Sequence, residues 1–218
     1  GLRESTNSEG HFNATVSNDE LILFIARGQI ANVDKDNDNL ATQYQCQLIA
    51  GCLLADGEYA FGDYYPATEG FEWRSVGYTL SNGSRNNVNA LTTLAAEFAY
   101  QYDVKYGYDN HQAHDHSDFE DVASAFHKNQ TFTPYDVVLA NSQVANLFSL
   151  QDIIGDLPAN LTQLNNFNQN IASVQNQIRY GALLAGLQQL ELEYRIENPS
   201  VEDEFITLVA TQFAEDQG

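Results

Sequence analysis

The pattern of hydrophobic and polar positions changes near residue 86 of this 218-residue chain. Before that point, short apolar or alternating runs are bounded by Gly, Asn, Asp and Ser, a pattern typical of β-strands. The run 20–26 is apolar after its first residue, so we expect a central strand buried on both faces. The predicted strands are residues 11–16, 20–26, 42–49 and 71–80.

Beyond residue 86, apolar residues recur every three or four positions, which predicts amphipathic helices. Thr133 followed by Pro134 and Asp136 is a strong helix start, with an N-cap, Pro in the first turn and an early acidic residue. Gly181 and Gly186 fall inside the longest predicted helix, which indicates a close helix contact or a kink. The predicted helices are residues 86–102, one from about 118, 133–150, 164–194 and one from about 200.

These elements predict an α+β fold in two domains. An antiparallel β-sandwich, expected to lack its first strands, would occupy residues 1–85, and an α-helical bundle would occupy residues 86–218. Aromatic side chains in the loops of such a domain usually pack in the core or at its rim, and the alternative is a groove for a ligand. The aromatic residues concerned are Tyr59, Phe61, Tyr64 and Tyr65.

The charge balance limits the partners that the chain could bind. It has 30 acidic and 9 basic residues, and its net charge is -21 at pH 7. Phosphate recognition needs clustered Lys and Arg, so we expect neither nucleic acid nor an anionic membrane surface as a partner. No apolar run approaches the roughly 20 residues of a membrane-spanning helix, so we expect no transmembrane segment.

The two cysteines, Cys46 and Cys52, are separated by five residues. This spacing suits a short disulfide-closed loop in an oxidising compartment, and the alternative is a pair of free thiols. A disulfide predicts an extracellular or cell-envelope location, either the outer surface or the periplasm.

Two loops carry residue types that bind metals. Asp34, Asp36 and Asp38 alternate with Lys and Asn, so their carboxylates could converge on Ca²⁺; the alternative is a solvated turn. The start resembles an EF-hand loop, but Asn39 stands where that loop needs Gly, and Gln45 stands where it needs Glu.

The second loop packs three imidazoles into six residues. His111, His114 and His116 could bind Zn²⁺ or Cu²⁺, with Asp115 or His127 as a fourth ligand. The alternative is a solvated polar loop before a helix, because Ser117 and Glu120 are spaced as a capping box.

Three stretches resemble bacterial secreted or lipid-anchored surface proteins in which a carboxypeptidase-regulatory-like, or transthyretin-like, β-sandwich precedes a helical region. They are Gly10-His11-Phe12, residues 71–76 together with 87–96, and residues 140–148 together with 180–190. The resemblance implies an extracellular or cell-envelope location and no catalytic residues.

No catalytic motif accompanies this pattern, since the chain lacks Gly-x-Ser-x-Gly, His-Glu-x-x-His and a phosphate-binding glycine loop. We therefore expect no enzyme but a non-catalytic extracellular or cell-surface module for adhesion, scaffolding or assembly. Its partner would be a second copy or an added strand at an open sheet edge. The alternative is a divalent-metal or small-ligand-binding protein that uses Asp34–Asp38 or His111–His116, and a hydrolase has the least support.

Overall fold

The computed structural model describes a defined part of the chain. The described residues are 11–16, 21–27, 43–54, 57–66, 72–78, 85–106, 133–198, 205–206, 208–209 and 212–213. Within them the fold is α+β, as predicted: six strands form three two-stranded antiparallel sheets, and helices pack around them. The finer predictions of a sandwich, a bundle and a boundary at residue 86 remain predictions.

The first sheet pairs β1 (Leu21–Arg27) with β6 (Glu72–Tyr78), so that Leu21 lies opposite Tyr78. Both strands were predicted, but β1 is not buried on both faces, since Ile25 is 38% exposed. Its only strand partner among the described residues is β6, and helices cover the face that carries Leu21 and Leu23.

Residues 11–16 were predicted to be a strand, and this prediction is wrong. They form no regular element, because their backbone joins no ladder within the described part of the chain. Phe12 still packs on the sheet, since the ring centroids of Phe12 and Phe24 are 5.8 Å apart.

The next strands form a small disulfide-closed unit, residues 43–54 and 57–66. In it β2 (Gln43–Gln45) pairs with β5 (Tyr64–Pro66), and β3 (Cys52–Leu54) pairs with β4 (Gly57–Tyr59). Cys46 and Cys52 are bonded, which confirms the predicted disulfide. Residues 42–49 contribute only three strand residues, and β4 and β5 fall in predicted loops, because strands of three residues are too short to show a period.

The central helix is α1 (Ala90–Tyr106), which begins four residues after the predicted start at residue 86. The Asn89 side chain caps it, because its Oδ1 accepts hydrogen bonds from the backbone N–H groups of Leu91 and Thr92, at 3.0 and 3.2 Å. All residues of α1 from Ala90 to Tyr100 are buried, so this stretch of the helix is enclosed rather than amphipathic. It contacts β6, α3 and α4.

The helix α3 (Pro134–Leu147) begins as predicted. Thr133 and Asp136 form a reciprocal capping box, in which each side chain accepts from the backbone N–H of the other residue. Its buried residues are Val137, Ala140, Val144 and Ala145, whereas Leu147, which the helical spacing also predicted to face inward, is 52% exposed.

The longest helix, α4 (Ala172–Glu197), begins later than the predicted residue 164 because the 3-10 helix η2 (Leu161–Asn166) and a turn precede it. At Gly181 the helix does approach another segment closely, since a Cβ would collide with the backbone carbonyl of Ala159, but Ala159 lies in the non-helical segment before η2, so the predicted helix–helix approach is not what this glycine serves. At Gly186 no close approach is seen, since no atom of the described residues lies within 4 Å of an added Cβ. Residues 205–206, 208–209 and 212–213 are helical, as expected for the last predicted helix.

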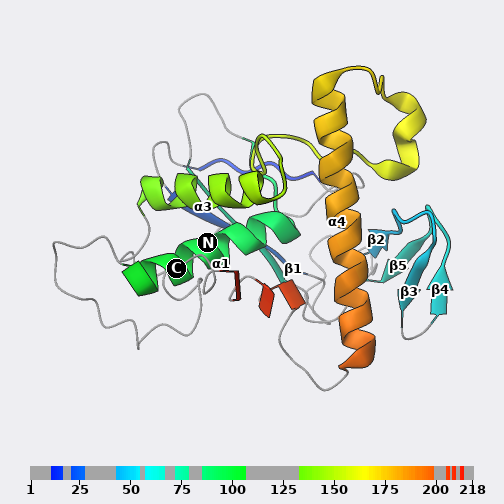
Figure 1. Ribbon diagram of the computed structural model, residues 1–218, viewed down its shortest axis with the longest axis horizontal. Helices are drawn as coiled ribbons and strands as arrows, with labels where there is room; N and C mark the ends of the chain where they lie inside the picture. Colours follow the sequence, from blue (N-terminus) through cyan, green and yellow to red (C-terminus); the bar gives the residue numbers. More distant parts are fainter. Residues whose placement is uncertain are drawn as a thin grey trace.

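In Figure 1, α4 stands across the directions of α1 and α3 and separates them from the disulfide-closed unit. One side of α4 joins a core that includes Leu91, Val144 and Tyr180, and Leu192 packs against the two cysteines on the other side. Among the helices of the described residues, none is long and apolar enough to cross a membrane.

Candidate functional site

Neither predicted metal loop can be assessed in the structure. Asp34, Asp36 and Asp38 lie outside the described residues, and so do His111, His114 and His116. The part of the chain that is described contains no other group of three or more His, Cys, Asp or Glu side chains that could hold a metal ion. The calcium site and the zinc or copper site therefore stay predictions.

Two polar clusters in the interior connect elements of the fold. The first, which we call the seam network, contains Asn87, Asn89, Ile153, Asp156 and Tyr180. The Asn89 Nδ2 donates to the Tyr180 hydroxyl at 2.9 Å, and this hydroxyl donates to the Ile153 carbonyl at 2.6 Å. The Asn87 Nδ2 donates to the carbonyls of Ile153 and Asp156, at 3.1 and 2.5 Å. Since the buried polar groups of the seam network are paired, we assign the network a structural role.

The second cluster is an ion-pair group between β6 and α1. Arg74 lies between Glu72, at 2.6 Å from its Nε, and Glu97, which is 4% exposed and bonded to its Nη1. Burial alone would lower the pKa of Arg74, but the charges and hydrogen bonds of Glu97 and Glu72 outweigh burial and raise that pKa. The Arg74 backbone N–H also donates to Thr93 Oγ1 at 2.8 Å, so the cluster attaches the strand to the helix.

A cavity of about 230 Å³ lies where the disulfide-closed unit, β6, the start of α1 and α4 meet. One wall is aromatic and comes from three different strands: Tyr44 in β2, Tyr65 in β5 and Trp73 in β6. The ring centroid of Tyr44 is 5.9 Å from that of Tyr65 and 5.3 Å from that of Trp73. These separations fall within the range of favourable aromatic pairs, so the three rings support one another as a wall.

The opposite wall belongs to α4. Leu184, Leu187 and Leu192 supply apolar surface, and Gln188, Glu191 and Arg195 supply polar groups. Arg195 Nε donates to Glu191 Oε1 at 2.5 Å, so these two charges neutralise each other at the cavity. A mostly apolar hollow with a few polar groups is the usual composition of a small-molecule site.

Tyr65 is the most unusual residue of the cavity. It is 1% exposed, and its hydroxyl makes no hydrogen bond of acceptable geometry within the described residues. Burial raises the pKa of Tyr65, and an interaction with the Gln188 side chain opposes this shift in part. Gln188 therefore lies close to the Tyr65 hydroxyl, which has no hydrogen-bond partner of acceptable geometry within the described residues.

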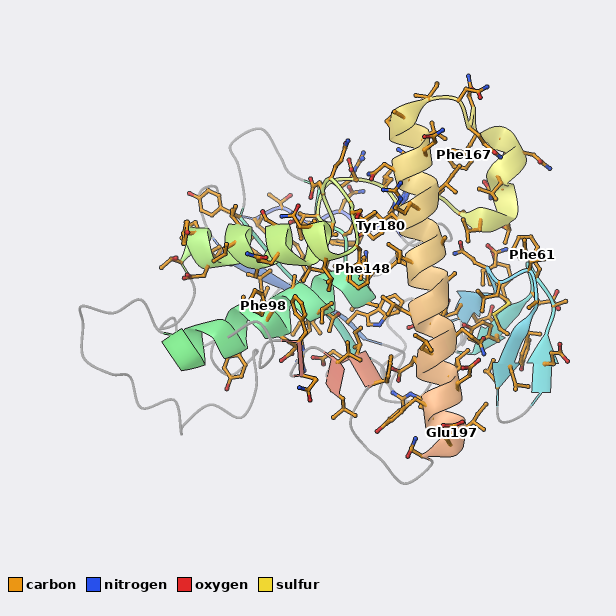
Figure 2. All side chains as sticks on the ribbon, in the orientation of Figure 1. Phe61, Phe98, Phe148, Phe167, Tyr180 and Glu197 are labelled. Atoms are coloured by element: carbon orange, nitrogen blue, oxygen red, sulfur yellow. A yellow bond between two sulfur atoms is a disulfide. The ribbon has the colours of Figure 1, made fainter. Side chains whose placement is uncertain are left out.

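The sequence pointed to part of this site. Of the four aromatic residues proposed for a groove, Tyr65 lines the cavity and Tyr59 packs on its ring, with centroids 5.6 Å apart. Tyr64 is 58% exposed and Phe61 is 39% exposed, and Figure 2 shows Phe61 at the outer end of the disulfide-closed unit. Neither lines the cavity.

The other cavity residues were missed. Trp73 is the single tryptophan of the chain and lies in a predicted strand, so its large ring was the one available signal. The cavity residues of α4 gave no signal in the sequence, because a polar residue such as Gln188 on a helix normally faces solvent.

Comparison of the chain with models of known protein families, with curated proteins and with solved structures finds no match. The function is therefore argued from the geometry of the cavity.

Proposed function

We propose that this chain is a non-catalytic binding module of an extracellular or cell-envelope protein, and that the cavity beside α4 is its ligand site. The observation that carries the proposal is the buried Tyr65 hydroxyl, which lacks a hydrogen-bond partner within the described residues and belongs to the wall of an aromatic-lined cavity. A buried polar group without a partner is costly to keep, and sites that bind ligands are where such groups persist.

The compartment is supported by the Cys46–Cys52 disulfide, because bonds of this kind persist where the environment is oxidising. This disulfide also bears on the site, since both cysteines pack with Tyr65 and Leu192 in one buried cluster. Adhesion, scaffolding or assembly would then depend on what the cavity binds. The transthyretin-like sandwich, the helical bundle and the two metal loops remain predictions on which this proposal does not rest.

The test fills the cavity from α4. Ala185 is 4% exposed and lines the cavity, whereas Ala182 is exposed on the same helix and does not line it. A library of small fluorinated ring compounds is screened by fluorine NMR against the native chain, Ala185→Leu and Ala182→Leu. We expect some compounds to bind the native chain and Ala182→Leu, and to lose binding to Ala185→Leu.

Thermal unfolding and circular dichroism of each variant establish that it is folded. If no compound binds the native chain, or if a folded Ala185→Leu binds as well as the native chain does, the cavity is not a ligand site.

A further inference from the structure

Resting on the proposed function, we infer that the cavity binds an uncharged ligand of about one ring, apolar over most of its surface and carrying one hydrogen-bond acceptor for the Tyr65 hydroxyl. The structure supports this class through the size of the cavity, the charges around it, and the polar groups that are already engaged.

The volume sets the size of the ligand. Pockets for drug-sized molecules measure roughly 300–1,000 Å³, and this cavity measures about 230 Å³. The aromatic wall of Tyr44, Tyr65 and Trp73 offers flat surface to a ring, which packs on aromatic faces in offset or tilted arrangements.

The charges exclude an ionic ligand. Glu191 and Arg195 are paired with each other, so neither of them needs a charged ligand to neutralise it. A charged ligand would also lose its hydration against Leu184, Leu187 and Leu192, which costs far more than an apolar contact returns.

The engaged polar groups exclude a ligand with many hydroxyls. Gln45 and Gln47 line the cavity, but Gln45 Oε1 accepts from Asn160 Nδ2 at 3.0 Å. Gln47 Oε1 accepts from the Leu161 backbone N–H at 2.9 Å. A sugar would bring more hydroxyls than the remaining groups can satisfy, and each unpaired hydroxyl would weaken binding. Tyr65 and the neighbouring Gln188 therefore supply the polar contact point of the cavity.

Four six-membered rings test the inference: cyclohexanone, methylenecyclohexane, cyclohexylammonium and glucose. Methylenecyclohexane has the shape of cyclohexanone without its acceptor oxygen, and the other two probes represent a cation and a polyol. Affinities come from isothermal titration calorimetry, and the emission of Trp73, the single tryptophan, reports whether a probe enters the cavity. We expect cyclohexanone to bind about threefold to tenfold more tightly than methylenecyclohexane, as for one hydrogen bond.

Tyr65→Phe removes only the hydroxyl, so it should abolish the preference for cyclohexanone and leave the affinity for methylenecyclohexane unchanged. Tyr64→Phe is the matched control, since Tyr64 is the neighbouring residue in β5 and is 58% exposed. It should keep the preference.

Each remaining outcome contradicts either the proposed ligand site or the inferred class of ligand. If none of the four probes binds, the proposed ligand site itself fails. If cyclohexanone and methylenecyclohexane bind equally to the native chain, or if cyclohexylammonium or glucose binds most tightly, the ligand class is wrong and the binding module stands. The class is equally overturned if the preference for cyclohexanone survives in Tyr65→Phe.

Discussion

Tyr180 and Tyr65 are both buried tyrosines, but their hydroxyl groups differ in hydrogen bonding. Tyr180 is 0% exposed and Tyr65 is 1% exposed, and burial raises the pKa of both above the usual value. The Tyr180 hydroxyl accepts one hydrogen bond and donates another inside the seam network. The Tyr65 hydroxyl has no partner of acceptable geometry within the described residues.

The surroundings explain the difference. Tyr180 lies on the side of α4 that faces α1 and α3 (Figure 2), where the Asn89 side chain and the Ile153 backbone carbonyl supply its hydrogen-bond partners. Tyr65 belongs to β5, which Figure 1 shows on the other side of α4, and it lines the cavity. Burial of a polar side chain therefore marks structure where the group is paired, and marks a candidate site where it is left open.

The largest expected effect tests how rigid the contact between α4 and the Ala159 backbone is. Gly181→Ala would drive a Cβ into the Ala159 backbone carbonyl, and backbone yields less readily than a flexible side chain. We expect the free energy of unfolding to fall by about 3 kcal/mol, at the upper end of overpacking effects. Urea unfolding measures it.

Gly186→Ala is the matched control on the same helix, because no atom of the part of the chain that is described lies within 4 Å of its added Cβ. It should leave stability unchanged or raise it by up to about 1 kcal/mol, since Ala favours helix. Equal effects of the two substitutions would contradict the close contact at Gly181.

Tyr180→Phe follows in size. It leaves Asn89 Nδ2 without its partner and removes one donor from the Ile153 carbonyl, which keeps Asn87 Nδ2 at 3.1 Å. We expect a loss of about 2–3 kcal/mol in urea unfolding, as for a buried donor left unpaired. Tyr135→Phe is the control, because Tyr135 is 66% exposed and should change stability little. A loss below about 0.5 kcal/mol for Tyr180→Phe would show that the network relaxes around the missing hydroxyl.

The features predicted correctly from the sequence have causes that lie close together in the chain. The capping box of α3 joins Thr133 to Asp136, and the disulfide joins cysteines six positions apart. The late start of α4 has a distant cause, since the segment before it is held by Gln45 through a bond across 115 positions. Hydrophobic periodicity does not report such a contact, so the sequence predicts a start near residue 164, inside η2, in place of Ala172.

The candidate site was likewise predictable only where its cause lies close together in the chain. Tyr65 could be named as one of four loop aromatics, but its distinction from Tyr64 depends on which face of a three-residue strand meets α4. A strand of this length has no readable alternation, so the two tyrosines are equivalent in the sequence. The partners Tyr44, Trp73 and Gln188 come from three separate elements and meet only in the folded chain.

Alkaline pH tests both tyrosines together. A tyrosine whose pKa is raised in the folded state holds its proton longer than it does in the unfolded chain, so the unfolded state binds fewer protons above pH 10. The stabilisation is fully present below about pH 10 and is lost as pH rises through the raised pKa. Each tyrosine should contribute a decline of about 1.4 kcal/mol per pH unit above pH 10.

Urea unfolding at several pH values between 9 and 12 measures this decline for the native chain, Tyr65→Phe and Tyr180→Phe. Each variant should show a slope that is shallower by one tyrosine's contribution. A native slope that neither substitution changes would mean that the buried hydroxyls do not set the alkaline limit.

The smallest expected effect separates the two tyrosines most clearly. Tyr65→Phe removes a buried hydroxyl that has no hydrogen-bond partner within the described residues. Below pH 10 the free energy of unfolding should therefore stay constant or rise by up to about 1 kcal/mol. Urea unfolding of the ligand-free chain measures it beside Tyr180→Phe. A loss of 1 kcal/mol or more would mean that the hydroxyl is already paired. Tyr65 would then be structural, as Tyr180 is, and the cavity would lose the polar group that makes it a candidate site.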